Sequence, residues 1–172
     1  MKKLITIIIT VALVLSCAVC IAEEEYDPRS EGYYMVSTTD ETALAFANDL
    51  AESNAAIYAQ FGVKTAVYVF DSMEGADITD DTMEALLSIH ESVVGDTSDD
   101  MVVLILLDKN DYAFWLGDSI KEKCPGDVIA EVTEAVKAGE NDSVFMEAAK
   151  VYSGIMFRFM AAGMGAQANG GN

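Results

Sequence analysis

Alternating apolar and polar blocks predict the central part of the fold. Residues 101–107 are apolar without interruption, which is typical of a strand that is buried on both faces. Four polar, turn-forming residues, 108–111, separate this run from a second apolar run at 112–116, and the pattern predicts a β-hairpin. Side chains alternate between the faces of a strand. We therefore expect two buried faces, with Val103 and Ile105 on one and Leu104 and Leu106 on the other.

Apolar residues at three- and four-residue spacing predict four helices, at 38–61, 77–94, 125–138 and 141–160. The β-branched and aromatic segment 63–70 predicts a further strand. Capping and turn chemistry sets the expected helix starts. These are Thr38 with Glu41 as a capping box, Asp77–Asp80, Pro125, and Asn141 or Asp142.

The order strand, helix, strand predicts a right-handed crossover between two parallel strands, followed by the antiparallel hairpin strand. A strand buried on both faces needs helices on both sides. The expected fold is thus α/β, a three-layer α/β/α sandwich around a small mixed sheet. We place this domain at 33–160, between a polar lead-in at 23–32 and a flexible tail of Gly, Ala and Asn at 161–172.

Residues 1–22 read as a signal peptide, because Lys2 and Lys3 precede a short apolar stretch and Ala22 offers a small residue for cleavage. A second interpretation is a lipoprotein signal processed at Cys17, and a third is a retained N-terminal anchor. All three predict an extracytoplasmic protein, either secreted or associated with the cell envelope.

The charge of the chain limits its partners. The formal net charge is −19, and removal of the leader with its two lysines makes the remainder more negative still. Nucleic acid and anionic lipid would be repelled, whereas divalent cations and basic groups would be attracted. Cleavage after Ala22 would leave Cys124 as the sole cysteine, so no internal disulfide is expected.

Several enzyme signatures are absent from the sequence. The single histidine, His90, shares helical spacing with apolar neighbours, which indicates a packed helix residue rather than a catalytic base. No G-x-S-x-G nucleophile motif and no G-x-x-x-x-G-K phosphate loop occur. Ala130 stands where a cysteine phosphatase loop starting at Cys124 would need arginine. No catalytic residue is predicted.

Clustered carboxylates are the remaining candidate chemistry, since hard cations such as Ca²⁺ prefer several oxygen ligands. The predicted topology brings Asp99, Asp100 and Asp118 to one edge of the sheet, and these are the candidate metal ligands. A second group lies at the opposite edge and consists of Asp71, Asp108 and Asp111. Ordinary solvated loop acids are the alternative interpretation of both groups.

The order and spacing of these elements resemble the TPM domain family over about Glu31 to Met160. Family members show a "D-N-G-V-L-L-L" run, here Asp99–Ile105, and a "G-x-G-x-E" piece after the hairpin, here Gly117–Lys121. An early family aspartate corresponds to Glu31. The departures that matter are the replacement of glycines by Met101 and Ser119 and of an acid by Lys121.

The resemblance implies an exported or envelope-anchored α/β/α domain. Some members of the family are described as acid phosphatases, some bind Ca²⁺, and others serve photosystem repair or receptor assembly. Two hypotheses follow. The first is a non-catalytic extracytoplasmic module that binds a divalent cation, with Ca²⁺ held by Asp99, Asp100 and Asp118. The second is a metal-dependent acid phosphatase. No residue identifies a substrate or a protein partner.

Overall fold

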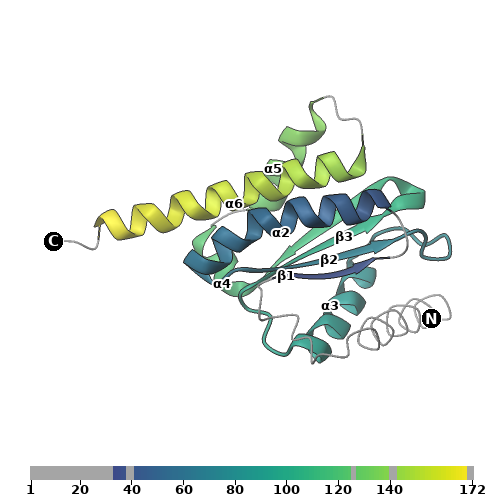
Figure 1. Cartoon of the computed structure of the whole chain (residues 1–172), viewed down its shortest axis with the longest axis horizontal. Coiled ribbons are helices and arrows are strands. Elements are labelled where there is room, and N and C mark those ends of the chain that lie inside the picture. The colour runs from purple at the N-terminus through teal and green to yellow at the C-terminus, as the bar shows by residue number, and fades with distance from the viewer. Residues whose placement is uncertain (1–32, 38–40, 125–126, 140–142, 170–172) are drawn as a thin grey trace.

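The computed structural model describes residues 33–37, 41–124, 127–139 and 143–169. The expected signal peptide and polar lead-in lie outside these residues. Helices and strands follow one another along the chain as in Figure 1. They are β1 (Tyr33–Ser37), α2 (Glu41–Phe61), β2 (Lys64–Phe70), α3 (Asp80–Val94), β3 (Asp100–Leu106), a short 3-10 turn η1 (Leu107–Lys109), β4 (Asp111–Leu116), α4 (Asp118–Lys123), α5 (Val128–Lys137) and α6 (Val144–Asn169).

The four strands form one mixed sheet in the order β1-β2-β3-β4. β1 pairs with β2 and β2 with β3 in parallel, whereas β3 and β4 form the antiparallel hairpin. The hairpin turn uses Asn110 in the left-handed conformation, with φ of 49°. The parallel pair joined by α3 and the antiparallel hairpin are both as the sequence predicts. The sequence did not predict β1.

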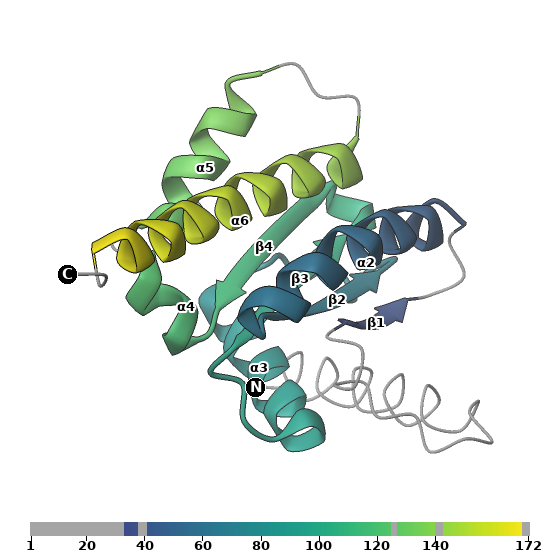
Figure 2. The same cartoon turned by 60° about the vertical axis from the view of Figure 1, so that its left-hand side comes forward.

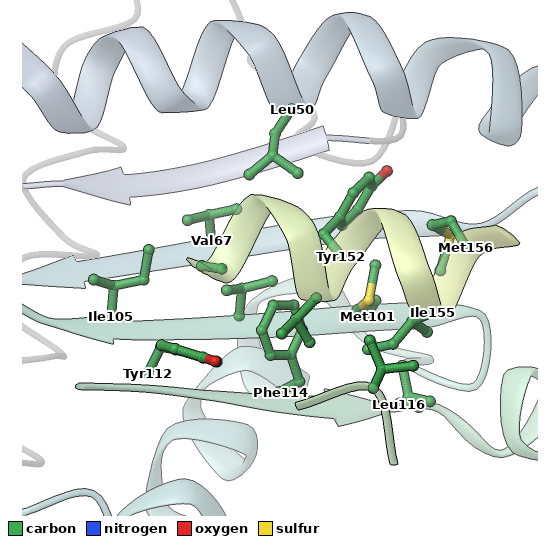
Figure 3. Packing of buried hydrophobic residues seen from close by; sticks show 14 of the residues in the cluster. Leu50, Val67, Met101, Ile105, Tyr112, Phe114, Leu116, Tyr152, Ile155 and Met156 are labelled. Carbon is green, nitrogen blue, oxygen red and sulfur yellow. The ribbon is translucent and has the colours of Figure 1, made fainter. Parts of the chain in front are cut away.

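Helices cover both faces of the sheet, and this confirms the α/β/α architecture. α2 and α6 lie on one face and α3 on the other (Figures 1 and 2). Strand β3 is buried along its whole length. Its residues Val103 and Ile105 belong to the larger core cluster with α2 and α6, and Leu104 and Leu106 belong to the cluster under α3, as expected. Figure 3 shows part of the larger cluster, in which Leu50 of α2, Val67 of β2, Ile105 of β3 and Tyr152 of α6 converge from four elements.

The helix starts follow capping chemistry. The Thr79 side chain accepts from the backbone N–H of Thr82 and caps α3 within the expected segment. Asp127 caps α5 in the same way, through Ala130 N, and Ser143 Oγ accepts from Met146 N at the start of α6. The other predicted start residues, Thr38, Pro125, Asn141 and Asp142, lie outside the described residues.

Two helical segments differ from the sequence expectation. The sequence did not predict α4, a short helix that directly follows the glycine at the end of β4. In addition, α6 continues to Asn169 and takes in most of the segment that was expected to be a tail. Among the described residues, no helix is long and apolar enough to cross a membrane.

Candidate functional site at the amino end of strand β3

The amino end of β3 and the carboxyl end of β4 are joined by close backbone contacts. Gly117 N donates to Asp100 O at 2.8 Å, and Ser119 N donates to Ser98 O at 3.1 Å. A Cβ atom at Gly117 would lie 2.2 Å from Ser98 O and 2.4 Å from Thr97 O. Only glycine fits here without a backbone shift. The close approach fixes α4 against the loop that leads into β3.

The topology places the three candidate metal ligands at this edge, as the sequence predicts. Asp99 immediately precedes β3 and is half-buried, and its carbonyl accepts from Lys64 N at 3.0 Å. Asp100 is the first residue of β3 and is 2% exposed. Asp118 begins α4, and its side chain is 88% exposed. Backbone contacts bring the three residues to the same edge of the sheet, but their side chains occupy very different environments.

The Asp100 carboxylate is engaged inside the core. Its Oδ2 lies 3.1 Å from His90 Nε2, and the other ring nitrogen, Nδ1, lies 2.7 Å from the Tyr68 hydroxyl. The Tyr68 and His90 rings meet edge to face, with centroids 5.8 Å apart. Tyr68 is 0% exposed and His90 is 1% exposed. The three side chains form a buried polar network between β2, α3 and β3.

Both ring nitrogens of His90 are engaged, Nε2 with the Asp100 carboxyl group and Nδ1 with the Tyr68 hydroxyl, and the tautomer of the ring sets which group donates in each contact. The carboxylate is only half satisfied, because Asp100 Oδ1 is buried and has no hydrogen-bond partner among the described residues. Such a carboxylate oxygen is costly to bury. The contact with His90 therefore has to offset the free-energy cost of burying the Asp100 carboxylate.

Asp118 meets Lys121 at the surface. Lys121 Nζ lies 3.6 Å from Asp118 Oδ1 and 5.0 Å from the centroid of the Trp115 ring. Both side chains of the ion pair are at least half exposed, so solvent screens the attraction. Lys121 nevertheless supplies a positive charge beside one of the candidate ligands, at the position where the resemblance implies an acid.

The described residues contain no group of three carboxylate, imidazole or thiol side chains arranged to hold a metal ion. At the opposite edge, the backbones of the second acidic group are also brought together. Asp108 N donates to Asp71 O at 3.0 Å, and Asp111 pairs with Leu106 in the hairpin. The Asp111 carboxylate accepts from Tyr112 N at 2.9 Å, which is an ordinary local contact.

A second buried polar group lies on the other face of the sheet. Asn54 Oδ1 accepts from Thr65 Oγ1 at 2.7 Å and from the Tyr152 hydroxyl at 3.1 Å, and it thereby joins α2, β2 and α6. Burial raises the pKa of Tyr152 to about 12. Burial, with Glu147 nearby, also raises the pKa of Tyr112 to about 12. Burial raises the pKa of the Cys124 thiol, which is free. These groups stay protonated at neutral pH.

The sequence did not predict the contact between His90 and Asp100, although it contained the signal. His90 lies four residues from both Leu86 and Val94, which face the sheet. Asp100 is in phase with Val102 on the strand face that α3 covers. The two periodicities place the imidazole and the carboxylate in the same layer.

Comparison of the chain with family models and with curated proteins gives no match. Among solved structures, it is similar to the solution structure of the N-terminal domain of a protein from P. gingivalis, at 14% sequence identity and a TM-score of 0.54. The similarity covers 78% of this chain and 86% of that domain. At this identity the likeness establishes the α/β fold alone.

Proposed function

We propose that this chain is a non-catalytic, extracytoplasmic module of the TPM type. The observation that carries the proposal is the burial of His90, whose 1% exposure removes the chain's single histidine from any substrate. Its two partners, Asp100 and Tyr68, are equally enclosed. These three side chains are thus used to join α3 to the sheet.

The cation part of the proposal rests on Asp99 and Asp118. Asp100 contributes its backbone at this edge, while its carboxylate is held by His90. Two carboxylates with carbonyl oxygens nearby are a sparse ligand set for Ca²⁺, which takes six to eight oxygens. The cation must also displace Lys121 from Asp118. We therefore expect weak binding, in the range known for extracellular calcium modules.

A metal-dependent acid phosphatase is the alternative function, and one observation favours it. Within the described part of the chain, Asp100 Oδ1 is a buried carboxylate oxygen without a hydrogen-bond partner, and a cation would satisfy it. Against this alternative, the net charge of −19 repels a phosphate ester unless a metal offsets it.

Hydrolysis of a phosphate monoester decides between the two functions. The assay covers acid to neutral pH with Ca²⁺, with Mg²⁺ and with a chelator, and it compares the wild type with the double variant Asp99→Asn/Asp118→Asn. Glu122→Gln/Glu134→Gln is the matched control, because it removes two exposed carboxylates from the neighbouring helices α4 and α5. We expect no turnover above the blank in any variant. Metal-dependent turnover that the Asp variant loses and the control keeps would establish the phosphatase instead.

A further inference from the structure

Strand β4 is only partly covered on the sheet face that packs against α3. Its residues Asp111, Ala113 and Trp115 alternate with buried residues along the strand and are themselves half-buried. The residues paired with them on β3 are at most 1% exposed. Trp115 packs against the core cluster under α3. The cover that α3 provides therefore ends between β3 and β4, and Trp115 lies at this margin.

The Trp115 ring and the Asp118 carboxylate share one ammonium group. Lys121 Nζ lies 5.0 Å from the centroid of the ring and 3.6 Å from Asp118 Oδ1. An aromatic face and a carboxylate each attract a cation. Asp118 begins α4 directly after the glycine that follows β4, and the close approach at Gly117 fixes this helix beside the end of the strand (Figure 2). We call Trp115 and Asp118 together the ammonium site.

Lys121 is a weakly held occupant of the ammonium site. Its side chain is 51% exposed and that of Asp118 is 88% exposed, so solvent screens their attraction. Holding a long lysine side chain in one place also costs conformational entropy. A basic side chain of another molecule can therefore replace Lys121 at a small cost in free energy.

The charge around the ammonium site favours a basic partner. The chain carries a net charge of −19, and residues 65–108, which include β2, α3 and β3, contain no Lys or Arg. Glu84 and Glu91 of α3 and Asp96 of the following loop are exposed. Such a surface attracts a positively charged segment from a distance and repels an acidic one.

We propose that Trp115 and Asp118 bind a lysine or arginine side chain from a basic segment of a partner protein, and that Lys121 occupies this site while the partner is absent. The proposal does not rest on Ca²⁺ binding, and it adds a protein partner to the proposed function. An exposed cation–π contact and an exposed ion pair each strengthen binding by roughly two- to fivefold. The ammonium site therefore selects the position of the partner, and the negative surface supplies the long-range attraction.

The emission of Trp115, the chain's single tryptophan, tests this proposal. The protein is purified after export from its full-length gene and kept in chelator, so that calcium plays no part. The probe is a short peptide of alternating lysine and serine at physiological ionic strength. Glutamine replaces lysine in the control peptide. The lysine peptide should change the emission in a saturable way, and the glutamine peptide should not.

Two pairs of variants with equal charge changes locate the contact. Lys121→Gln vacates the ammonium site, so it should bind the lysine peptide roughly two- to fivefold more tightly than Lys123→Gln of the same helix. Asp118→Asn should bind it more weakly than Glu134→Gln, which removes an exposed carboxylate from α5. Circular dichroism checks that each variant is folded.

Equal affinities within both pairs would overturn the proposal, because the peptide would then respond to net charge alone. Calorimetric binding of the lysine peptide without a change in Trp115 emission would also overturn it, since the contact would lie elsewhere. The proposal fails as well if neither the wild type nor Lys121→Gln binds the lysine peptide.

Discussion

His90 Nε2 lies 3.1 Å from Asp100 Oδ2, and this contact joins α3 to the first residue of β3 inside the core. Removal of one member of a buried pair leaves the other charge or donor uncompensated. We therefore expect His90→Leu to lower the free energy of unfolding by about 3–5 kcal/mol. Urea denaturation followed by circular dichroism measures the change.

The double variant His90→Leu/Asp100→Ala is the control for this effect. It leaves no charge buried, so it should be more stable than His90→Leu alone, and the two substitutions should couple strongly. Simple additivity of the two single losses would show that the contact is not an energetic unit.

Gly117→Ala tests the close approach between β4 and the loop before β3. The new methyl group would lie 2.2 Å from Ser98 O, and backbone must move to relieve the clash. We expect a loss of roughly 1–3 kcal/mol in stability, the usual cost of overpacking. Gly139→Ala is the matched control, since its nearest contact would be 3.3 Å from Val136 O. Equal stability of the two variants would argue against a tight junction at Gly117.

The sequence predicted the layers of the fold because buried helix and strand faces require apolar residues at regular spacing. The unbroken apolar run at 101–107 indicated the central strand, and its odd and even residues lie in the two clusters expected. Two elements, β1 and α4, have no such regular pattern in the sequence. β1 is five residues long and follows a polar segment, and α4 has six residues, too few for helical spacing to emerge.

The candidate site was predicted at the level of the backbone and not of the side chains. Strand order alone brings Asp99, Asp100 and Asp118 to one edge, and the structure does place them there. Whether each carboxylate is buried or exposed depends on the direction in which its side chain points. Asp100 points under α3 to His90, whereas Asp118 points into solvent beside Lys121. The direction of Asp100 follows from its phase with Val102 on β3, which the sequence contains. The direction of Asp118 depends on α4, which the sequence did not predict.

Alkaline pH should destabilise the protein through its buried tyrosines. The pKa of Tyr152 is raised to about 12, so the folded state holds its proton where the unfolded chain releases it. A raised pKa contributes stability that is complete below pH 10 and is lost as pH rises from about 10 to about 12. The contribution is at most roughly 2.7 kcal/mol for a shift of two pKa units.

Denaturation curves at several alkaline pH values test this prediction. Tyr152→Phe should lose less stability over this interval than the wild type, and Tyr112 accounts for part of the remainder. Parallel losses in the wild type and Tyr152→Phe would contradict the role assigned to the Tyr152 hydroxyl.

Lys121 should compete with a divalent cation for Asp118, to which it is paired at 3.6 Å. Lys121→Gln removes the competitor, so Ca²⁺ at millimolar concentrations should raise the melting temperature of this variant more than that of the wild type. Lys123→Gln, a lysine on the same helix whose Nζ lies over the Phe159 ring, is the control. If Ca²⁺ does not change the melting temperature of Lys121→Gln, the proposed cation binding at Asp99 and Asp118 is wrong.

We propose that the chain's single histidine, His90, has a structural role in the core and takes no part in catalysis. Diethylpyrocarbonate also acylates lysine, tyrosine and cysteine side chains, but the absorbance of N-carbethoxyhistidine in the untagged protein reports on His90 alone, because no other histidine is present. With His90 1% exposed, the native protein should be modified far more slowly than the urea-unfolded chain, and at a rate set by unfolding. A native modification rate equal to that of the unfolded chain would show an accessible imidazole and contradict the claim.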